Sequence, residues 1–236
     1  MFQRLKRSIR PSMMTITVFS LLAIFVVIEG FAYFASYKEQ YYSEVKARLA
    51  SVAELKISEI KQWRLERWND GLIFLNNAVY TKNVNRFMAD SNDQDARIRI
   101  ENWMNHIFIG NNYSSILLSD LKMRPRIIVG DLFPRGSLTI SNENLALLRK
   151  GEIVFEDLNL GPAGKPAMKV IVPIKNPANE LLAIVSLQID PDRYLYPFIN
   201  KWPGFEKTPE TLLIRRDGDS VIFLNDLKHT AGAALK

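Results

Sequence analysis

Residue types that commonly carry catalysis are scarce in this chain and do not cluster. Histidine occurs only as His106 and His229, and cysteine is absent. The histidines are far apart and lack metal-ligand spacing to a neighbour, while the lack of cysteine excludes disulfides, thiolate metal sites and cysteine nucleophiles. The sequence also has no serine nucleophile elbow, phosphate-binding loop or paired-carboxylate motif. We therefore predict no catalytic site, metal or cofactor, and any enzymatic output would lie in sequence that this chain lacks.

Aspartates stand at the ends of three expected strands, as Asp120, Asp157 and Asp190. Carboxylates at such positions commonly cap turns by accepting backbone hydrogen bonds. Together with the two histidines they are the only support for an envelope hydrolase, so we interpret them as capping groups.

A compact group of tryptophans and arginines offers recognition chemistry: Trp63, Arg64, Arg67 and Trp68. The pairs Trp63–Arg67 and Arg64–Trp68 both have i,i+4 spacing, so on a helix each guanidinium can lie against an indole. Two interpretations remain open. The group is either a ligand floor in which the arginines face a carboxylate, or a packing surface with snorkelling arginines.

The segment that carries this group predicts one long helix, from residue 36 to about residue 80. Glycine and proline are absent from residues 32–70, where good helix formers dominate. Its apolar residues share one face: Val45, Leu49, Val52, Ile60 and Trp63. This seam could pair with a second copy as a homodimer or pack on its own domain.

An almost uninterrupted apolar run precedes this helix, at residues 13–35, and Arg4, Lys6, Arg7 and Arg10 come before it. About 20 apolar residues at roughly 1.5 Å each span a hydrocarbon core, so we predict a transmembrane helix at 12–35. The basic tail, residues 1–11, favours a cytoplasmic N-terminus in a bacterial inner membrane, with the rest of the chain outside.

The alternative of a cleaved signal peptide requires a shorter apolar core and small residues at the cut. Ala32 and Ala35 are small, but the core is longer than such peptides have. Glu29 is the only charge within the run and lies toward its outer end, where it can reach the headgroups.

The composition after the anchor is that of a folded domain. Hydrophobic residues make up 47% of the chain and charged residues 24%, which is normal for globular proteins. The net charge of +6 owes much to the basic tail, so it does not indicate nucleic-acid binding.

The pattern beyond the long helix predicts an α+β fold. A second helix is expected at 93–108 and a short one at 141–150, with Ser141 as N-cap and Gly151 just past its end. Five strands are expected at 113–120, 126–130, 153–158, 167–174 and 181–189. We therefore predict a five-stranded antiparallel sheet with the helices on one side.

Three blocks of the sequence resemble the extracytoplasmic double Cache sensor modules, which are PAS-like, of bacterial signal-transduction proteins. The first is Lys56-x-x-x-Ile60-x-x-Trp63-x-x-x-Arg67, and the second covers 185–191, 194–199 and Trp202-Pro203. The third and most specific is 210–219 with 221–225, which is similar to the hairpin that opens the membrane-proximal half. Such modules usually lie between two membrane helices and precede a histidine kinase or diguanylate cyclase. The resemblance implies a sensory input domain.

The same resemblance implies a ligand site on the sheet face that is covered by helices and loops. The polar or aromatic side chains able to point there are Trp103, His106, Tyr113, Arg126, Lys169 and Asp190. Two of them, Lys169 and Arg126, favour an anionic small molecule, because a charge-assisted contact in a partly desolvated cleft is strong. The alternative is a solvated sheet edge.

Strand alternation predicts which face each of these side chains occupies. Tyr113 is expected on the face of Ser115 and Leu117, and Lys169 on the face opposite Val170. The aromatic, arginine and aspartate pattern of amino-acid-binding Cache domains is not evident around residues 103–120, which argues against an amino-acid ligand.

The third block begins a unit that the chain does not complete. Asp217-Gly218 predicts a two-residue hairpin loop, but too few residues follow it for three more strands and a second membrane helix. We therefore expect a sensor domain with its long helix at 36–205 and the truncated start of a membrane-proximal unit at 206–236. The alternative function is an envelope interaction protein without a ligand pocket.

Overall fold

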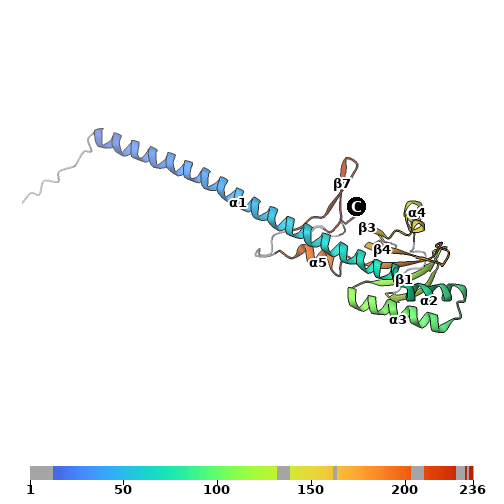
Figure 1. Ribbon diagram of the computed structural model, residues 1–236. Coiled ribbons are helices and arrows are strands. Elements are labelled where there is room, and N and C mark those ends of the chain that lie inside the picture. The colour runs from blue at the N-terminus through green and yellow to red at the C-terminus, as the bar shows by residue number, and fades with distance from the viewer. Residues whose placement is uncertain are drawn as a thin grey trace, which may run out of the picture. The chain divides into compact units, whose positions relative to one another are not determined.

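The computed structural model describes residues 13–131, 139–161, 164–202, 210–226, 232 and 234–235. The chain divides into two compact units, Met1–Ile57 and Ser58–Lys236. The first helix, α1 (Met13–Leu75), contributes residues to both units (Figure 1). The basic residues predicted to face the cytoplasm lie outside the described residues.

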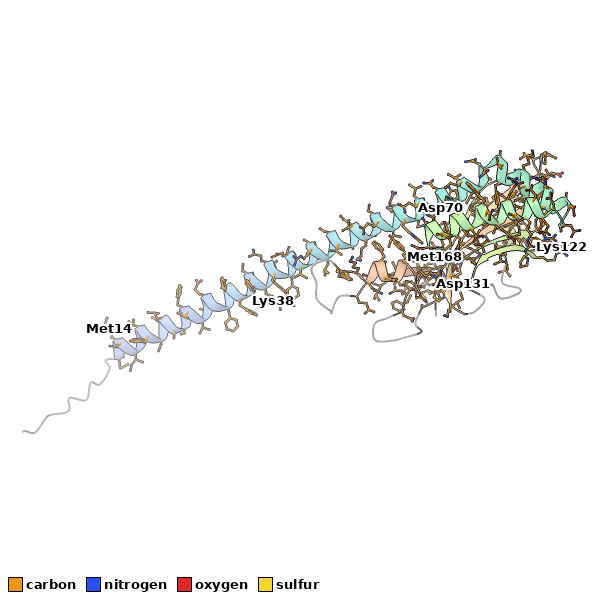
Figure 2. All side chains as sticks on the ribbon, turned by 90° about the horizontal axis from the view of Figure 1, so that it is seen from below. Met14, Lys38, Asp70, Lys122, Asp131 and Met168 are labelled. Atoms are coloured by element: carbon orange, nitrogen blue, oxygen red, sulfur yellow. The ribbon has the colours of Figure 1, made fainter. Side chains whose placement is uncertain are left out.

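The first unit consists, in its described part, of the N-terminal portion of α1. A window of 18 residues there has a mean hydropathy of 2.2 and none of it is buried. Side chains project outward all around this portion, which includes Met14 and Lys38 (Figure 2). Within the described chain, α1 is the one helix that is long and apolar enough to cross a membrane. Just beyond the apolar run, Tyr37 stacks on Tyr33 and Tyr41, with centroids 6.3 Å and 6.5 Å apart.

The helical part of the second unit contains a break that the sequence interpretation missed. The long helix ends at Leu75 rather than near Tyr80, and α2 (Ala78–Ala89) is a separate helix. Asn77 is its N-cap and accepts a hydrogen bond from the Tyr80 amide. An N-cap asparagine favours a helix start over a continuous helix, which explains the break.

The next helix follows the prediction more closely. Asp93 is the N-cap of α3 (Gln94–Asn111), which ends with Asn112 in a left-handed conformation. The helix therefore ends three residues, nearly one turn, beyond the expected end at residue 108. It lies beside α2 (Figure 1).

The sheet has five antiparallel strands in the order β2-β1-β5-β4-β3. Their bounds are β1 (Ser115–Asp120), β2 (Pro125–Gly130), β3 (Val154–Leu160), β4 (Pro166–Lys175) and β5 (Leu181–Ile189). The short helix between β2 and β3 is α4 (Asn142–Lys150), with Ser141 as N-cap and Gly151 in a left-handed C-cap. The predicted α+β class, strand number and antiparallel pairing are confirmed.

The main core lies between one face of the sheet and α1, α2, α3 and the short helix α5 (Leu195–Asn200). Phe74, Ile100 and Met104 of the helices are fully buried there against alternate strand residues such as Val170 and Leu187. Gly71 allows α1 to approach β4 closely, since a Cβ at this position would lie 3.1 Å from Val170.

The opposite face of the sheet is covered as well, and this corrects the prediction that all helices lie on one side. Leu148 of α4 packs there with Val154, Ile171 and Ile184. All six residues of β1 are buried, as expected for a strand with both faces covered.

The chain continues into a separate two-stranded sheet, β6 (Ile214–Asp217) and β7 (Ser220–Phe223). Asp217 pairs with Ser220, so the loop is Gly218-Asp219, one residue later than predicted. Gly218 has a φ of +59°, which suits glycine at the first loop position.

Candidate functional site

A cavity of about 640 Å³ lies on the α4 face of the sheet. Strands β3, β4 and β5 form its floor, and the start of α4 with residues 139–141 forms part of its wall. We call it the α4-face cavity. Its volume falls within the range of small-molecule sites, which is roughly 300–1,000 Å³.

A row of polar side chains crosses the floor of this cavity. In the strand register Glu156 of β3 pairs with Lys169 of β4, and Lys169 pairs with Gln188 of β5. Gln188 in turn pairs with Ser115 of β1. Directly paired residues share one face of a sheet, so four neighbouring strands each place a polar group on this side. The central strands β1, β4 and β5 are otherwise mostly apolar and buried, so a polar row across them is unusual.

The charged members of the row neutralise each other. Lys169 Nζ lies 2.8 Å from Glu156 Oε2 and donates a hydrogen bond of 3.0 Å to the carbonyl of Thr139. The two side chains are only 15% and 18% exposed, so the pair is largely shielded from solvent. The amide of Asn144 donates to the other Glu156 oxygen at 2.9 Å.

The cap of helix α4 positions Asn144. Its backbone N–H donates to the Ser141 hydroxyl, which is the N-cap contact that begins α4. The first turn of α4 is thereby fixed over β3, and the Asn144 side chain reaches the row.

The neutral polar side chains of the floor are also ordered. Gln188 Nε2 donates to the Ser186 hydroxyl at 2.7 Å, and both residues are buried. Asp157, at the cavity edge, pairs with Arg64 of α1 at 2.8 Å. The cavity therefore offers amides, a hydroxyl and one balanced ion pair, which can bind a small polar molecule through hydrogen bonds.

The six residues expected to form one site are dispersed. Lys169 lines the α4-face cavity. Asp190 lines a different cavity of about 170 Å³ together with Trp63 and Arg67. Trp103 and His106 lie on α3, with ring centroids 6.3 Å apart, and His106 is exposed.

The other two expected residues lie on the helix side of the sheet or at its end. Tyr113 is buried in the main core and precedes β1, so strand alternation does not govern it. The prediction that it shares a face with Leu117 is wrong, because its hydroxyl bonds Asp70 of α1. Arg126 donates to the Ser91 hydroxyl and lies 5.9 Å from the Phe87 ring centroid.

The arginines of the tryptophan–arginine group contact distant parts of the chain rather than the expected indoles. Arg64 lies over Phe155, 4.3 Å from its centroid, and Arg67 lies over Tyr113 at 5.3 Å. Arg67 also donates to the carbonyl of Asn111 at 2.6 Å. These contacts fit the packing interpretation.

Sequence reasoning missed the residues around Lys169, namely its ion-pair partner Glu156, its strand neighbour Gln188, and Asn144, which bonds Glu156. A signal for two of them was available, because Glu156 and Gln188 are polar residues within strands that are otherwise mainly apolar. Among the described residues, no three His, Asp or Glu side chains are grouped to hold a metal ion.

No protein-family model and no curated protein matches the chain. Among solved structures, the sensor domain of the V. cholerae histidine kinase DctB is similar, with a TM-score of 0.41 and 10% sequence identity. The match covers 64% of this chain and 58% of that one.

Proposed function

We propose that this chain is the membrane-anchored sensory input part of a signal-transduction protein, and that it binds a small ligand in the α4-face cavity. The observation that carries the proposal is the polar row of Glu156, Lys169 and Gln188 under a cavity of about 640 Å³. A sheet that only needed to pack against α4 would be more stable with apolar side chains at these positions. The resemblance of the sequence to double Cache modules supports the same role.

The ligand is proposed to be a small anion. Its carboxylate or phosphate group would replace Glu156 as the partner of Lys169 and gain a charge-assisted hydrogen bond. Glu156 then acts as an internal competitor that keeps Lys169 neutralised in the unliganded protein. Arg126 does not line this cavity and has no part in the proposal.

The ligand signal is proposed to travel through α1. Gly71 of α1 would meet Val170 and Val172 of β4 if it carried a Cβ, and Val170 is the residue next to Lys169. A shift of β4 on ligand binding would therefore act directly on α1, as a small helix displacement. The same helix contains the apolar segment and, just beyond it, stacked tyrosines of the kind found at membrane interfaces.

The proposal also covers the membrane orientation, the pairing of two copies and the output domain. The N-terminus lies in the cytoplasm, the second unit lies outside the inner membrane, and two copies pair through the long helix. The output is a histidine kinase or diguanylate cyclase outside this chain.

A thermal-shift screen of the full chain in detergent micelles against small carboxylates and organic phosphates tests the ligand site. A ligand at 100 times its Kd should stabilise the folded state by about 2.7 kcal/mol. Lys169→Ala should abolish the shift, and Glu156→Gln should strengthen it because the competing charge is gone. Arg126→Ala removes the other predicted cation and is the matched control, so it should leave the shift intact.

The variants also define the results that would contradict the proposal. A shift that survives Lys169→Ala would place the ligand elsewhere, and a shift weakened by Glu156→Gln would exclude competition for Lys169. If no anion stabilises the protein, the proposal fails and the envelope interaction protein becomes the better interpretation.

A further inference from the structure

Another cavity, of about 550 Å³, lies between α2 and α3. Its wall includes Val79, Tyr80 and Asn83 from α2, and Arg99 and Trp103 from α3. It shares no lining residue with the α4-face cavity. We call it the α2–α3 cavity.

Two polar groups on the lining side chains of this cavity have no hydrogen-bond partner. They are the hydroxyl of Tyr80 and the indole N–H of Trp103, and both atoms are shielded from solvent. Tyr80 as a whole is only 3% exposed and packs edge-on against Phe74. Burial raises the pKa of Tyr80, so its hydroxyl stays protonated and can donate. Buried polar groups without partners are rare, because each loses its hydration without compensation.

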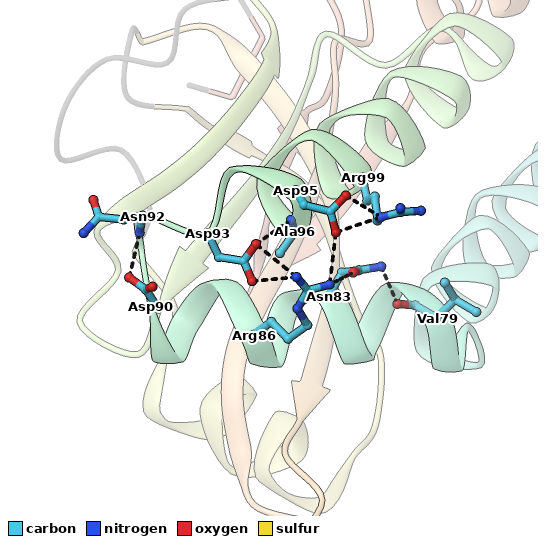
Figure 3. Close-up of polar contacts among 9 residues, drawn as sticks. All are labelled: Val79, Asn83, Arg86, Asp90, Asn92, Asp93, Asp95, Ala96 and Arg99. Atoms are coloured by element: carbon cyan, nitrogen blue, oxygen red, sulfur yellow. Dashed lines mark hydrogen bonds and ion pairs between the residues drawn. The ribbon is translucent and has the colours of Figure 1, made fainter.

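Figure 3 shows that other polar groups of α2, α3 and the loop between them are already paired. Asn83 donates to the Val79 carbonyl at 2.9 Å, and Arg86 bridges Asp93 at 2.9 Å and Asp95 at 3.2 Å. Arg99 binds the same Asp95 through Nε at 3.0 Å. This network ties α2 to α3 and holds the wall in place. It supplies no acceptor to Tyr80 or Trp103.

We propose that the α2–α3 cavity is a second ligand site and that it takes a small organic acid with an apolar body. The two carboxylate oxygens would accept from the Tyr80 hydroxyl and the Trp103 indole N–H once these side chains turn their shielded donors toward the cavity, which gives each orphan donor a partner. Arg99 is the one charged side chain among the residues that line the cavity, and an anion bound there would share it with Asp95. The Trp103 ring and Val79, which is 70% exposed, would contact the apolar body.

The indole resonances of the full chain, labelled with ¹⁵N and held in detergent micelles, test this proposal with benzoate as the probe. Trp103→Phe identifies the Trp103 signal among the four tryptophans. Added benzoate should move that signal downfield in a saturable manner, because its N–H gains an acceptor. Tyr80→Phe should weaken benzoate binding by about tenfold, the effect of losing one hydrogen bond of ordinary strength.

Control variants separate this site from the other cavity and from loss of folding. Lys169→Ala alters only the α4-face cavity and should leave the benzoate response unchanged. Tyr80→Phe should not lower the melting temperature without benzoate, since its hydroxyl has no partner to lose. The proposal is overturned if the Trp103 signal does not respond, if Tyr80→Phe binds benzoate as tightly as the wild type, or if Lys169→Ala removes the response.

Discussion

The hydroxyl of Tyr113 donates a hydrogen bond of 2.6 Å to Oδ2 of Asp70, and both residues are buried. Asp70 lies on α1 (Figure 2), whereas Tyr113 lies just before β1. Arg67, one turn earlier on α1, places Nη2 3.2 Å from the same carboxylate oxygen. The distal part of α1 is therefore held to the sheet by a buried polar contact in addition to the apolar core.

Tyr113→Phe should destabilise the protein by about 1–3 kcal/mol, because it leaves the buried Asp70 carboxylate without its hydroxyl donor. The matched control is Tyr80→Phe, which also removes a hydroxyl from a buried tyrosine but breaks no hydrogen bond. Chemical denaturation of both variants in the same micelles measures the difference. If both substitutions lower the free energy of unfolding equally, the Tyr113–Asp70 hydrogen bond contributes nothing to stability.

The pH dependence of stability should carry a contribution from Asp70. Burial raises the pKa of its carboxyl above the ordinary value of 3.8, and this outweighs the opposite effects of Tyr113 and Arg67. The folded protein then holds a proton that the unfolded chain has released. Asp70 therefore contributes stability that is complete below pH 3.8 and is lost as the pH rises through the raised pKa.

Asp70→Asn isolates this contribution, because asparagine resembles the neutral carboxyl and does not ionise. The free energy of unfolding of the variant minus that of the wild type should increase as the pH rises from 3.8 through the raised pKa. Each unit by which the pKa is raised corresponds to about 1.4 kcal/mol. A difference that decreases with pH would mean that Arg67 dominates and that the pKa is lowered instead.

The elements with strong local signals could be predicted from the sequence. Ser141 and Gly151 bound α4 as expected, since a serine N-cap and a left-handed glycine act through adjacent backbone groups. The strand at 181–189 was also predicted with its observed bounds. The break at Asn77 was missed because the adjacent asparagines Asn76 and Asn77 were not weighed as an N-cap signal.

The candidate site was less predictable than the fold. Only Lys169 of the six expected residues lines the α4-face cavity. Its neighbours Glu156, Gln188 and Asn144 come from two other strands and a helix, so strand register and helix capping bring them together. The orientation of Tyr113 was not predictable from strand alternation either. Its side chain points toward α1, where its hydroxyl donates a hydrogen bond to Asp70.

The predicted orientation in the membrane can be tested with reporter fusions. Alkaline phosphatase fused after Lys236 should be active, and a cytoplasmic reporter at the same site should be inactive, because the basic tail keeps the N-terminus inside. As a control, each reporter fused after Pro11, before the apolar run, should give the opposite result. Phosphatase that is inactive after Lys236 but active after Pro11 would reverse the predicted topology.

The β6–β7 hairpin should be the least protected part of the second unit. Its strands are short and mostly exposed, whereas the central strands β1, β4 and β5 of the main sheet are mostly buried. We expect amide hydrogens in β6 and β7 to exchange much faster than those in β1, β4 and β5. Equal protection of the two sheets would contradict this prediction.

A single side chain, Asn225, should limit how fast this hairpin opens. It is 2% exposed, accepts from the Leu213 amide at 2.7 Å and donates to the Thr211 carbonyl at 3.0 Å. Asn225→Ala removes both bonds and should speed exchange in β6 and β7 by about tenfold or more, since each buried hydrogen bond contributes roughly 1 kcal/mol. Asp219→Ala, at an exposed loop position, is the control and should change nothing. If Asn225→Ala instead speeds exchange throughout β1, β4 and β5, the hairpin opens only together with the main sheet, and local opening is excluded.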